Sequence, residues 1–147
     1  MEVIKIKGTP HSGKTNRLLE MFMNEVFIDA PIKNMLLTCE ETHETIFKRF
    51  RTKCEDNGHV VTEVKNTTSI MDIAVDGKDK LLKYLKEIDE PMNIFIDMPM
   101  LLANMTLDEL GAIDNNNIRC LMYTLSLPIT KDSFDKDKKV KKELIIE

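Results

Sequence analysis

The sequence predicts an α/β protein with a mostly parallel central sheet of five or six strands flanked by helices. Short apolar runs alternate along the 147 residues with longer amphipathic segments, the pattern of parallel strands joined by helical crossovers. The length suits a single domain over residues 1–147, and 42% hydrophobic residues can fill its core. No internal repeat and no Gly/Ser/Pro-rich linker divides the chain.

Two strand–helix units are expected in the first half of the chain. Apolar residues at helical spacing predict a helix that starts at Gly13 or Lys14 and is ended by residues 29–31. A second helix is expected from Thr42, a good N-cap residue, to Asn57-Gly58. The strands before these helices are expected at Val3–Lys7 and Met35–Thr38.

The second half follows the same pattern, apart from one segment. β-Branched residues favour a third strand at Val60–Val64, whereas residues 65–76 suit either a helix or a strand. Thr106 opens a short helix, because Asp108 and Glu109 fall in a first turn where the helix dipole favours carboxylates. The remaining expected elements are a helix at Asp79–Ile88, strands at Met92–Asp97 and Ile118–Leu125, a solvated charged loop at Lys131–Glu143 and a last strand at Leu144–Ile146.

Charge and cysteine content argue against several classes of protein. Lys and Arg (21) nearly balance Asp and Glu (25), so the formal charge of −4 does not indicate a dedicated nucleic-acid or membrane-binding protein. The three cysteines have no CxxC spacing, which favours neither a disulfide framework nor a zinc site and fits a reducing cytoplasm. No stretch approaches the ~20 apolar residues that cross a bilayer, so we expect neither a membrane span nor a targeting segment.

The segment Gly8 to Thr15 matches GxxxxGK[ST] at every specified position, between an expected strand and an expected helix. A chance match in a chain of this length has odds of about one in two hundred. In such a loop the backbone N–H groups face phosphate oxygens, Lys14 reaches the β and γ phosphates as a catalytic group, and the Thr15 hydroxyl coordinates Mg²⁺. The residues expected to bind the nucleotide are Gly8, Thr9, Pro10, His11, Ser12, Gly13, Lys14, Thr15 and Asn16.

Asp97 ends an apolar strand and is the expected acidic group on the metal side of the site. Thr15 and Asp97 would then hold Mg²⁺ together with ATP or another nucleoside triphosphate. The alternative is that Asp97 caps the turn at Met98-Pro99. Because Met98 and not a glutamate follows, a base that activates water must come from another strand.

The segment from Met35 to Phe50 resembles the second strand and following helix of the RecA-like ATPases, especially the DnaB-type replicative helicases. In that family a Ser-Leu-Glu-like tripeptide ends the strand and an arginine follows on the helix. Here Thr38-Cys39-Glu40 stands at the tripeptide and Arg49 at a comparable distance. The resemblance implies that Glu40 is the catalytic base, with Glu41 as the near alternative.

A second stretch, Tyr123 to Pro128, resembles the sensor strand of the same family, although Leu127 stands where the family has a glutamine. The arginine-rich segment that serves a neighbouring subunit has no counterpart in residues 129–147. The resemblance therefore implies a minimal RecA-like P-loop core.

Two further groups of residues have alternative interpretations. Apolar residues after Asp97 suit core packing or an adaptable patch for a protein partner, and they are Met98, Met100, Leu101, Leu102 and Met105. A basic cluster is interpreted as a solvated helix face, as no aromatic series accompanies it, and it comprises Lys48, Arg49, Arg51 and Lys53. His43 and His59 are expected at the surface.

Three functions are compatible with these observations. The first is Mg²⁺-dependent ATP binding with slow hydrolysis, coupled to a protein partner or to a second copy of the chain. The second is a nucleotide-dependent regulatory protein with negligible hydrolysis. The third is a phosphotransferase such as thymidine kinase. The segment Gly8–Thr15 also resembles the phosphate loop of that family, but the zinc-binding cysteines of the family are not apparent in this sequence.

Overall fold

One parallel sheet organises the chain. The computed structural model describes residues 1–9, 12–28, 32–39, 41–60, 68–72, 77–126 and 142–146. Within these residues, six strands pair in the order β3-β2-β4-β5-β1-β6, and all neighbouring strands are parallel. The predicted α/β class with a parallel sheet is confirmed. The strands are β1 Glu2–Gly8, β2 Lys33–Thr38, β3 Thr68–Asp72, β4 Met92–Asp97, β5 Ile118–Ser126 and β6 Lys142–Ile146.

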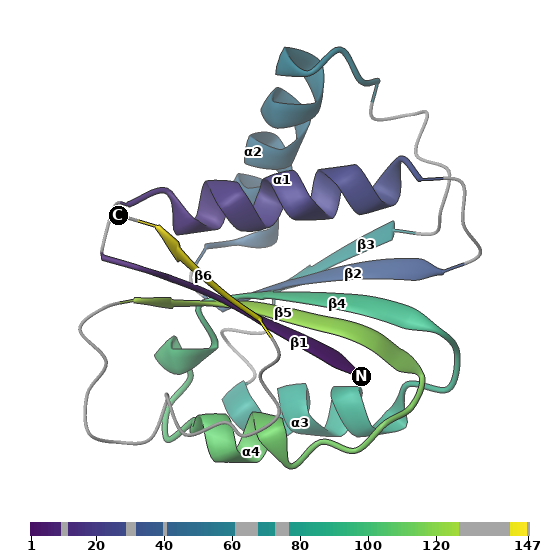
Figure 1. Cartoon of the computed structure of the whole chain (residues 1–147), viewed down its shortest axis with the longest axis vertical. Helices are drawn as coiled ribbons and strands as arrows, with labels where there is room; N and C mark the ends of the chain where they lie inside the picture. The colour runs from purple at the N-terminus through teal and green to yellow at the C-terminus, as the bar shows by residue number, and fades with distance from the viewer. Residues whose placement is uncertain are drawn as a thin grey trace.

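Helices cover both faces of the sheet. The helices α1 and α2 lie on one face, and α3 and α4 lie on the other (Figure 1). None of the helices in the described part of the chain has the length and apolar character needed to cross a membrane. The helical elements are α1 Lys14–Val26, α2 His43–Asp56, α3 Gly77–Glu87, the 3-10 helix η2 Pro99–Leu101 and α4 Leu107–Gly111.

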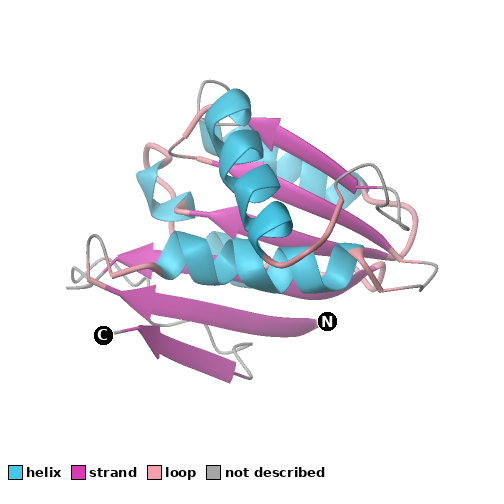
Figure 2. Ribbon diagram, turned by 90° about the horizontal axis from the view of Figure 1, so that it is seen from above, coloured by secondary structure: helices cyan, strands magenta, loops and turns pink. Residues whose placement is uncertain are grey.

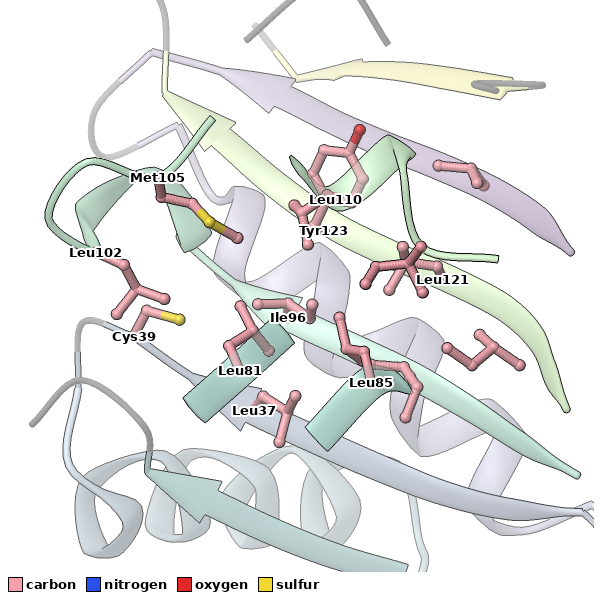
Figure 3. Close-up of a cluster of buried hydrophobic side chains, with 14 of the residues drawn as sticks. Leu37, Cys39, Leu81, Leu85, Ile96, Leu102, Met105, Leu110, Leu121 and Tyr123 are labelled. Carbon is pink, nitrogen blue, oxygen red and sulfur yellow. The ribbon is translucent and has the colours of Figure 1, made fainter. Parts of the chain in front are cut away.

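Alternation along the buried strands divides the apolar side chains between two cores. In β4, Phe95 packs toward α1 and α2, whereas Ile94 and Ile96 pack toward α3. Phe22 of α1 joins the first core, with ring centroids 5.1 Å from both Phe50 and Phe95 in edge-to-face geometry. Figure 3 shows the second core, where side chains of α3 and α4 meet those of the strands.

Local capping explains where two of the helices begin. The Thr42 hydroxyl accepts a hydrogen bond of 3.3 Å from the Thr45 N–H, which caps α2 as predicted. Before α4, Thr106 Oγ1 accepts from the Glu109 N–H at 3.3 Å while the Glu109 carboxylate accepts from the Thr106 N–H at 3.0 Å. This reciprocal capping box confirms the short helix expected after Thr106.

The third strand differs from the prediction. Val60 lies outside any strand, residues 61–67 are outside the described part, and β3 occupies Thr68–Asp72. This strand falls in the segment for which helix and strand were both left open. Pairing with β2 selects the strand, because β3 lies parallel to β2 at the edge of the sheet, with Ile70 opposite Leu36. The β-branched residues from 60 to 64 carried no information about that partner.

Because the strands are parallel, the carboxyl ends of β1, β2, β4 and β5 lie at the same edge of the sheet. In a parallel sheet the carboxyl ends point the same way, and ligands of such folds bind outside those ends. Strand β5 lies between β1 and β4, and Figure 2 shows α1 crossing this part of the sheet. The segment after β1 and the end of β4 are therefore brought together, although they are far apart in sequence.

Candidate functional site

The loop after β1 turns sharply into α1. The Ser12 N–H donates to the Thr9 carbonyl at 3.1 Å, and Gly13 follows with φ of 92°, which a residue with a side chain rarely adopts. The helix then starts at Lys14, one of the two predicted starts, and Gly13 is its N-cap. Pro10 and His11, both expected nucleotide contacts, lie outside the described residues.

The start of α1 is suited to an anion. Among the described residues, no side chain caps this helix and no acidic residue lies in its first turn. Its first N–H groups and the positive end of its dipole therefore face the loop with no carboxylate in the helix's own first turn to compensate them. Lys14 is only 7% exposed, and its Nζ donates to the Thr9 carbonyl at 3.3 Å, so the ammonium lies over the loop. The Ser12 hydroxyl oxygen is buried and has no hydrogen-bond partner within the described part of the chain.

Asp97 receives hydroxyl groups from two other elements. The Thr15 Oγ1 donates to Asp97 Oδ1 at 3.0 Å, although 82 positions separate the two residues. The Thr124 Oγ1 of β5 donates to the same oxygen at 2.8 Å. The Asp97 side chain is fully buried, so these hydrogen bonds fix its carboxylate against the start of α1. The alternative role, a cap on the following turn, gains no support from these two hydrogen bonds.

Thr124 has a second role that the sequence did not reveal. Its hydroxyl accepts a hydrogen bond of 2.8 Å from the Met98 N–H. Met98 has φ of 56°, a left-handed conformation that is costly for a residue with a long side chain and that places Pro99 at the start of η2. One buried hydroxyl thus holds both the carboxylate and the strained turn behind it. The signal available in the sequence was a threonine between apolar neighbours near the end of a strand.

Glu41 follows the carboxyl end of β2 and is held by contacts with α2 and β2. The Arg49 guanidinium forms an ion pair with Glu41 and also donates to Asn16 Oδ1 at 2.9 Å. The Glu41 backbone is anchored at β2, because the Thr38 hydroxyl donates to the Glu41 carbonyl at 2.8 Å. The Glu41 Oε2 atom is buried and has no hydrogen-bond partner among the described residues. Glu40, the predicted base, lies outside the described part.

These groups surround a hollow of about 570 Å³, which we call the first hollow. One wall is polar and includes Lys14, Thr15 and Glu41, while Met98, Met100 and Leu101 form an apolar wall. The apolar residues after Asp97 were expected either to pack in the core or to form a patch for a protein partner, and the structure divides them between buried and exposed positions. Met98, Leu102 and Met105 are buried, whereas Leu101 is 52% exposed beside the hollow. The residues lining the first hollow are Gly13, Lys14, Thr15, Asn16, Glu41, Arg49, Met98, Met100, Leu101 and Ser126.

The oxygen atoms at Asp97 fit a hard divalent cation. A carboxylate and a threonine hydroxyl are ligands that Mg²⁺ prefers, and Mg²⁺ usually takes one or two protein ligands and keeps several waters. In the described part of the chain, this site included, no group of three or more His, Cys, Asp or Glu side chains is placed to hold a metal ion. A cation at Thr15 and Asp97 would therefore depend on a ligand such as a phosphate to complete its shell.

The structure brings together the described part of the predicted site. Lys14, Thr15 and Asn16 line the first hollow, and Asp97 lies behind Thr15. In comparisons with protein-family models, with curated proteins and with solved structures, nothing matched this chain. Its function is therefore inferred from the geometry of this site.

Proposed function

We propose that the protein binds a nucleoside triphosphate with Mg²⁺ in the first hollow and hydrolyses it slowly, as a minimal RecA-like P-loop ATPase. The observation that carries the proposal is the 3.0 Å hydrogen bond between Thr15 and Asp97. It joins the last residue of a phosphate-loop motif to the carboxylate expected on the metal side. The two residues belong to different elements and are 82 positions apart in the sequence.

Different residues of the site would bind the phosphates, the metal ion and the rest of the nucleotide. Backbone N–H groups at the start of α1 and the Ser12 hydroxyl would donate to phosphate oxygens, and the Lys14 ammonium would neutralise their charge. Thr15 and Asp97 would hold Mg²⁺, which when bound neutralises phosphate charge and orients the terminal phosphate. The apolar wall at Met98 and Met100 would exclude water from one side of the ligand.

The proposal is tested first at Lys14. Substitution Lys14→Ala should weaken binding of Mg·ATP by about 10- to 100-fold, the effect of losing a hydrogen bond to a charged group. Calorimetry measures the affinity, and circular dichroism checks the fold. The matched control is Lys83→Ala in α3, an exposed lysine on the opposite face of the sheet. Equal affinity for Mg·ATP in the wild type and in Lys14→Ala, both well folded, would exclude the proposal.

The hydrolytic step depends on a base, for which Glu40 is the prediction and Glu41 the alternative. Glu40→Gln should lower single-turnover phosphate release by about 10²- to 10⁴-fold while nucleotide binding persists. Glu41→Gln should then change the rate little. The opposite result would assign the base to Glu41, which lines the first hollow beside Lys14. If neither substitution matters in an active enzyme, the RecA-like mechanism is wrong.

The second candidate function is a nucleotide-dependent regulatory protein with negligible hydrolysis. It is favoured by one specific feature, the ion pair with Arg49 that engages Glu41, the alternative base. The absence of phosphate release in wild-type protein that binds Mg·ATP would select this function over the ATPase. A phosphotransferase would instead show transfer to an added acceptor, which the same assay can include.

A further inference from the structure

A second hollow lies beside the first. It has a volume of about 520 Å³ and is bounded by the start of α1 and by one side of α2. Asn16 and Arg49 line both hollows, so the two spaces adjoin at the Arg49–Asn16 hydrogen bond of 2.9 Å. The residues lining the second hollow are Asn16, Lys48, Arg49, Thr52, Lys53, Asp56 and Asn57.

The second hollow is positively charged in a protein whose formal charge is −4. Lys48, Arg49 and Lys53 contribute three cations, and Asp56 contributes the one carboxylate of the lining. Within the described part of the chain, neither Lys48 nor Lys53 forms an ion pair. Because Arg49 is paired with Glu41, the excess positive charge comes from Lys48 and Lys53 beside the single carboxylate of Asp56, and this excess favours an anionic ligand.

The lining also indicates which part of a ligand would be recognised. Its side chains are cations, amides, one hydroxyl and one carboxylate, so no aromatic or aliphatic side chain offers a surface for stacking a base. Arg and Lys side chains with neighbouring amides are the usual partners of phosphate oxygens. The lining from Lys48 to Asn57 follows α2 for about 14 Å at the helical rise of about 1.5 Å per residue, enough for more than one phosphate.

The basic cluster is accessible to solvent, as predicted, because Lys48 and Arg51 are exposed and Arg49 and Lys53 are half-buried, but its cations do not share one environment. Three of its four cations line the second hollow. The fourth, Arg51, lies over the Phe47 ring with 5.0 Å between the guanidinium carbon and the ring centroid. The cluster is therefore divided between two sides of α2, and only one side is shaped to receive a ligand.

We propose that the second hollow is a binding site for a phosphate-bearing ligand, held by Lys48, Arg49 and Lys53 next to the first hollow. The phosphates could belong to a small phosphate ester or to the backbone of a single-stranded nucleic acid, which share this chemistry. The site does not depend on the proposed function, because Lys48 and Lys53 do not line the first hollow.

The test uses the full-length Lys14→Ala protein, so that binding at the phosphate loop is weakened in every sample. Two probes are titrated, inorganic pyrophosphate by calorimetry and a fluorescein-labelled oligodeoxythymidine of 12 nucleotides by anisotropy. The variant Lys48→Glu/Lys53→Glu is compared with Lys83→Glu/Lys86→Glu. The second pair lies on α3, makes the same change in net charge and alters exposed residues.

We expect the α2 pair to weaken binding at least tenfold and the α3 pair to change it less than twofold. Three cation–phosphate contacts predict that oligonucleotide affinity falls about 20-fold between about 50 and about 200 mM salt, because each contact in a single strand contributes a slope of roughly −0.7. Binding of pyrophosphate alone identifies a small ester, and tighter binding of the oligonucleotide identifies a strand. The proposal is overturned if the protein binds neither probe, or if the α2 and α3 pairs weaken binding equally.

Failure of this proposal is distinguishable from failure of the proposed function. Loss of Mg·ATP binding on Lys14→Ala concerns the first hollow only, whereas the charge reversals at Lys48 and Lys53 concern the second. Circular dichroism on each variant checks that the charge changes leave α2 folded. If Lys48→Glu/Lys53→Glu unfolds the protein, the single change Lys48→Glu, at an exposed position, provides the comparison.

Discussion

Thr124→Val is the perturbation that tests the buried network most directly. The change keeps the shape of a β-branched side chain and removes its hydroxyl. In the structure that hydroxyl donates to Asp97 Oδ1 at 2.8 Å and accepts from the Met98 N–H at 2.8 Å, and Thr124 is fully buried. Both hydrogen bonds would be lost at once at a fully buried position.

The expected cost follows from these two hydrogen bonds. A hydrogen bond to a charged group contributes about 1.5–3 kcal/mol, and a buried N–H that loses its acceptor costs about 1–3 kcal/mol. Allowing for some relaxation of the turn at Met98, we expect Thr124→Val to lower the free energy of unfolding by about 3 kcal/mol. The loss is a large part of the roughly 5–15 kcal/mol that stabilises a typical domain.

Urea denaturation measures this loss. With a slope of about 2 kcal/mol per molar urea, the midpoint should fall by about 1.5 M. The control is Thr124→Ser, which keeps the hydroxyl and removes one methyl group, at a cost of about 1 kcal/mol. If Thr124→Val is as stable as Thr124→Ser, the hydroxyl does not hold Asp97 and the turn together, and our account of the site's rigidity is refuted.

Three further predictions concern the metal, an ion pair and the thiols. Asp97→Asn should weaken Mg²⁺-dependent nucleotide binding more than binding in EDTA, and equal losses would remove Asp97 from the metal side. A hydrogen bond from the Lys78 side chain, followed by one from the Thr106 N–H, holds the pKa of Glu109 below its ordinary value of 4.5. The stabilisation by ionised Glu109 is therefore present above pH 4.5 and lost as the pH falls through the lowered pKa. The free energies of unfolding of the wild type and of Glu109→Gln should accordingly differ at neutral pH and become equal in acid. Burial raises the pKa of Cys54 to about 11 and that of Cys120 to about 12, so both thiols should react slowly with a disulfide reagent at pH 8 and rapidly once urea unfolds the chain.

Several elements could be predicted from the sequence because their signals are local. The start of α1 at Lys14 follows from two local signals. Gly13 can adopt the positive φ that the turn before the helix requires, and apolar residues follow at helical spacing. The caps at Thr42 and Thr106 are also local, since each hydroxyl bonds a backbone N–H three residues away. Strand β4 was predicted with its observed bounds, because a run of buried apolar residues ends at a charge.

The candidate site divides in the same way. The phosphate-loop motif and the position of Asp97 at a strand end are visible in the sequence, since each depends on consecutive residues. The contact between Thr15 and Asp97 depends on strand order. Strand β5 lies between β1 and β4, so the chain that leaves β1 must bring the start of α1 over β5 to the end of β4. The role of Thr124 became apparent only when β5 was placed between them.

The tertiary structure alone decided the position of β3 and the shared role of Arg49. The first depends on pairing with β2, and the second depends on Asn16, 33 positions away from Arg49. Propensity and spacing describe what a segment can form, whereas pairing and packing select one arrangement by burying surface that no segment can bury alone. The sequence by itself therefore determined the fold class, the GxxxxGK[ST] pattern and the starts of the capped helices, and packing determined which polar side chains meet.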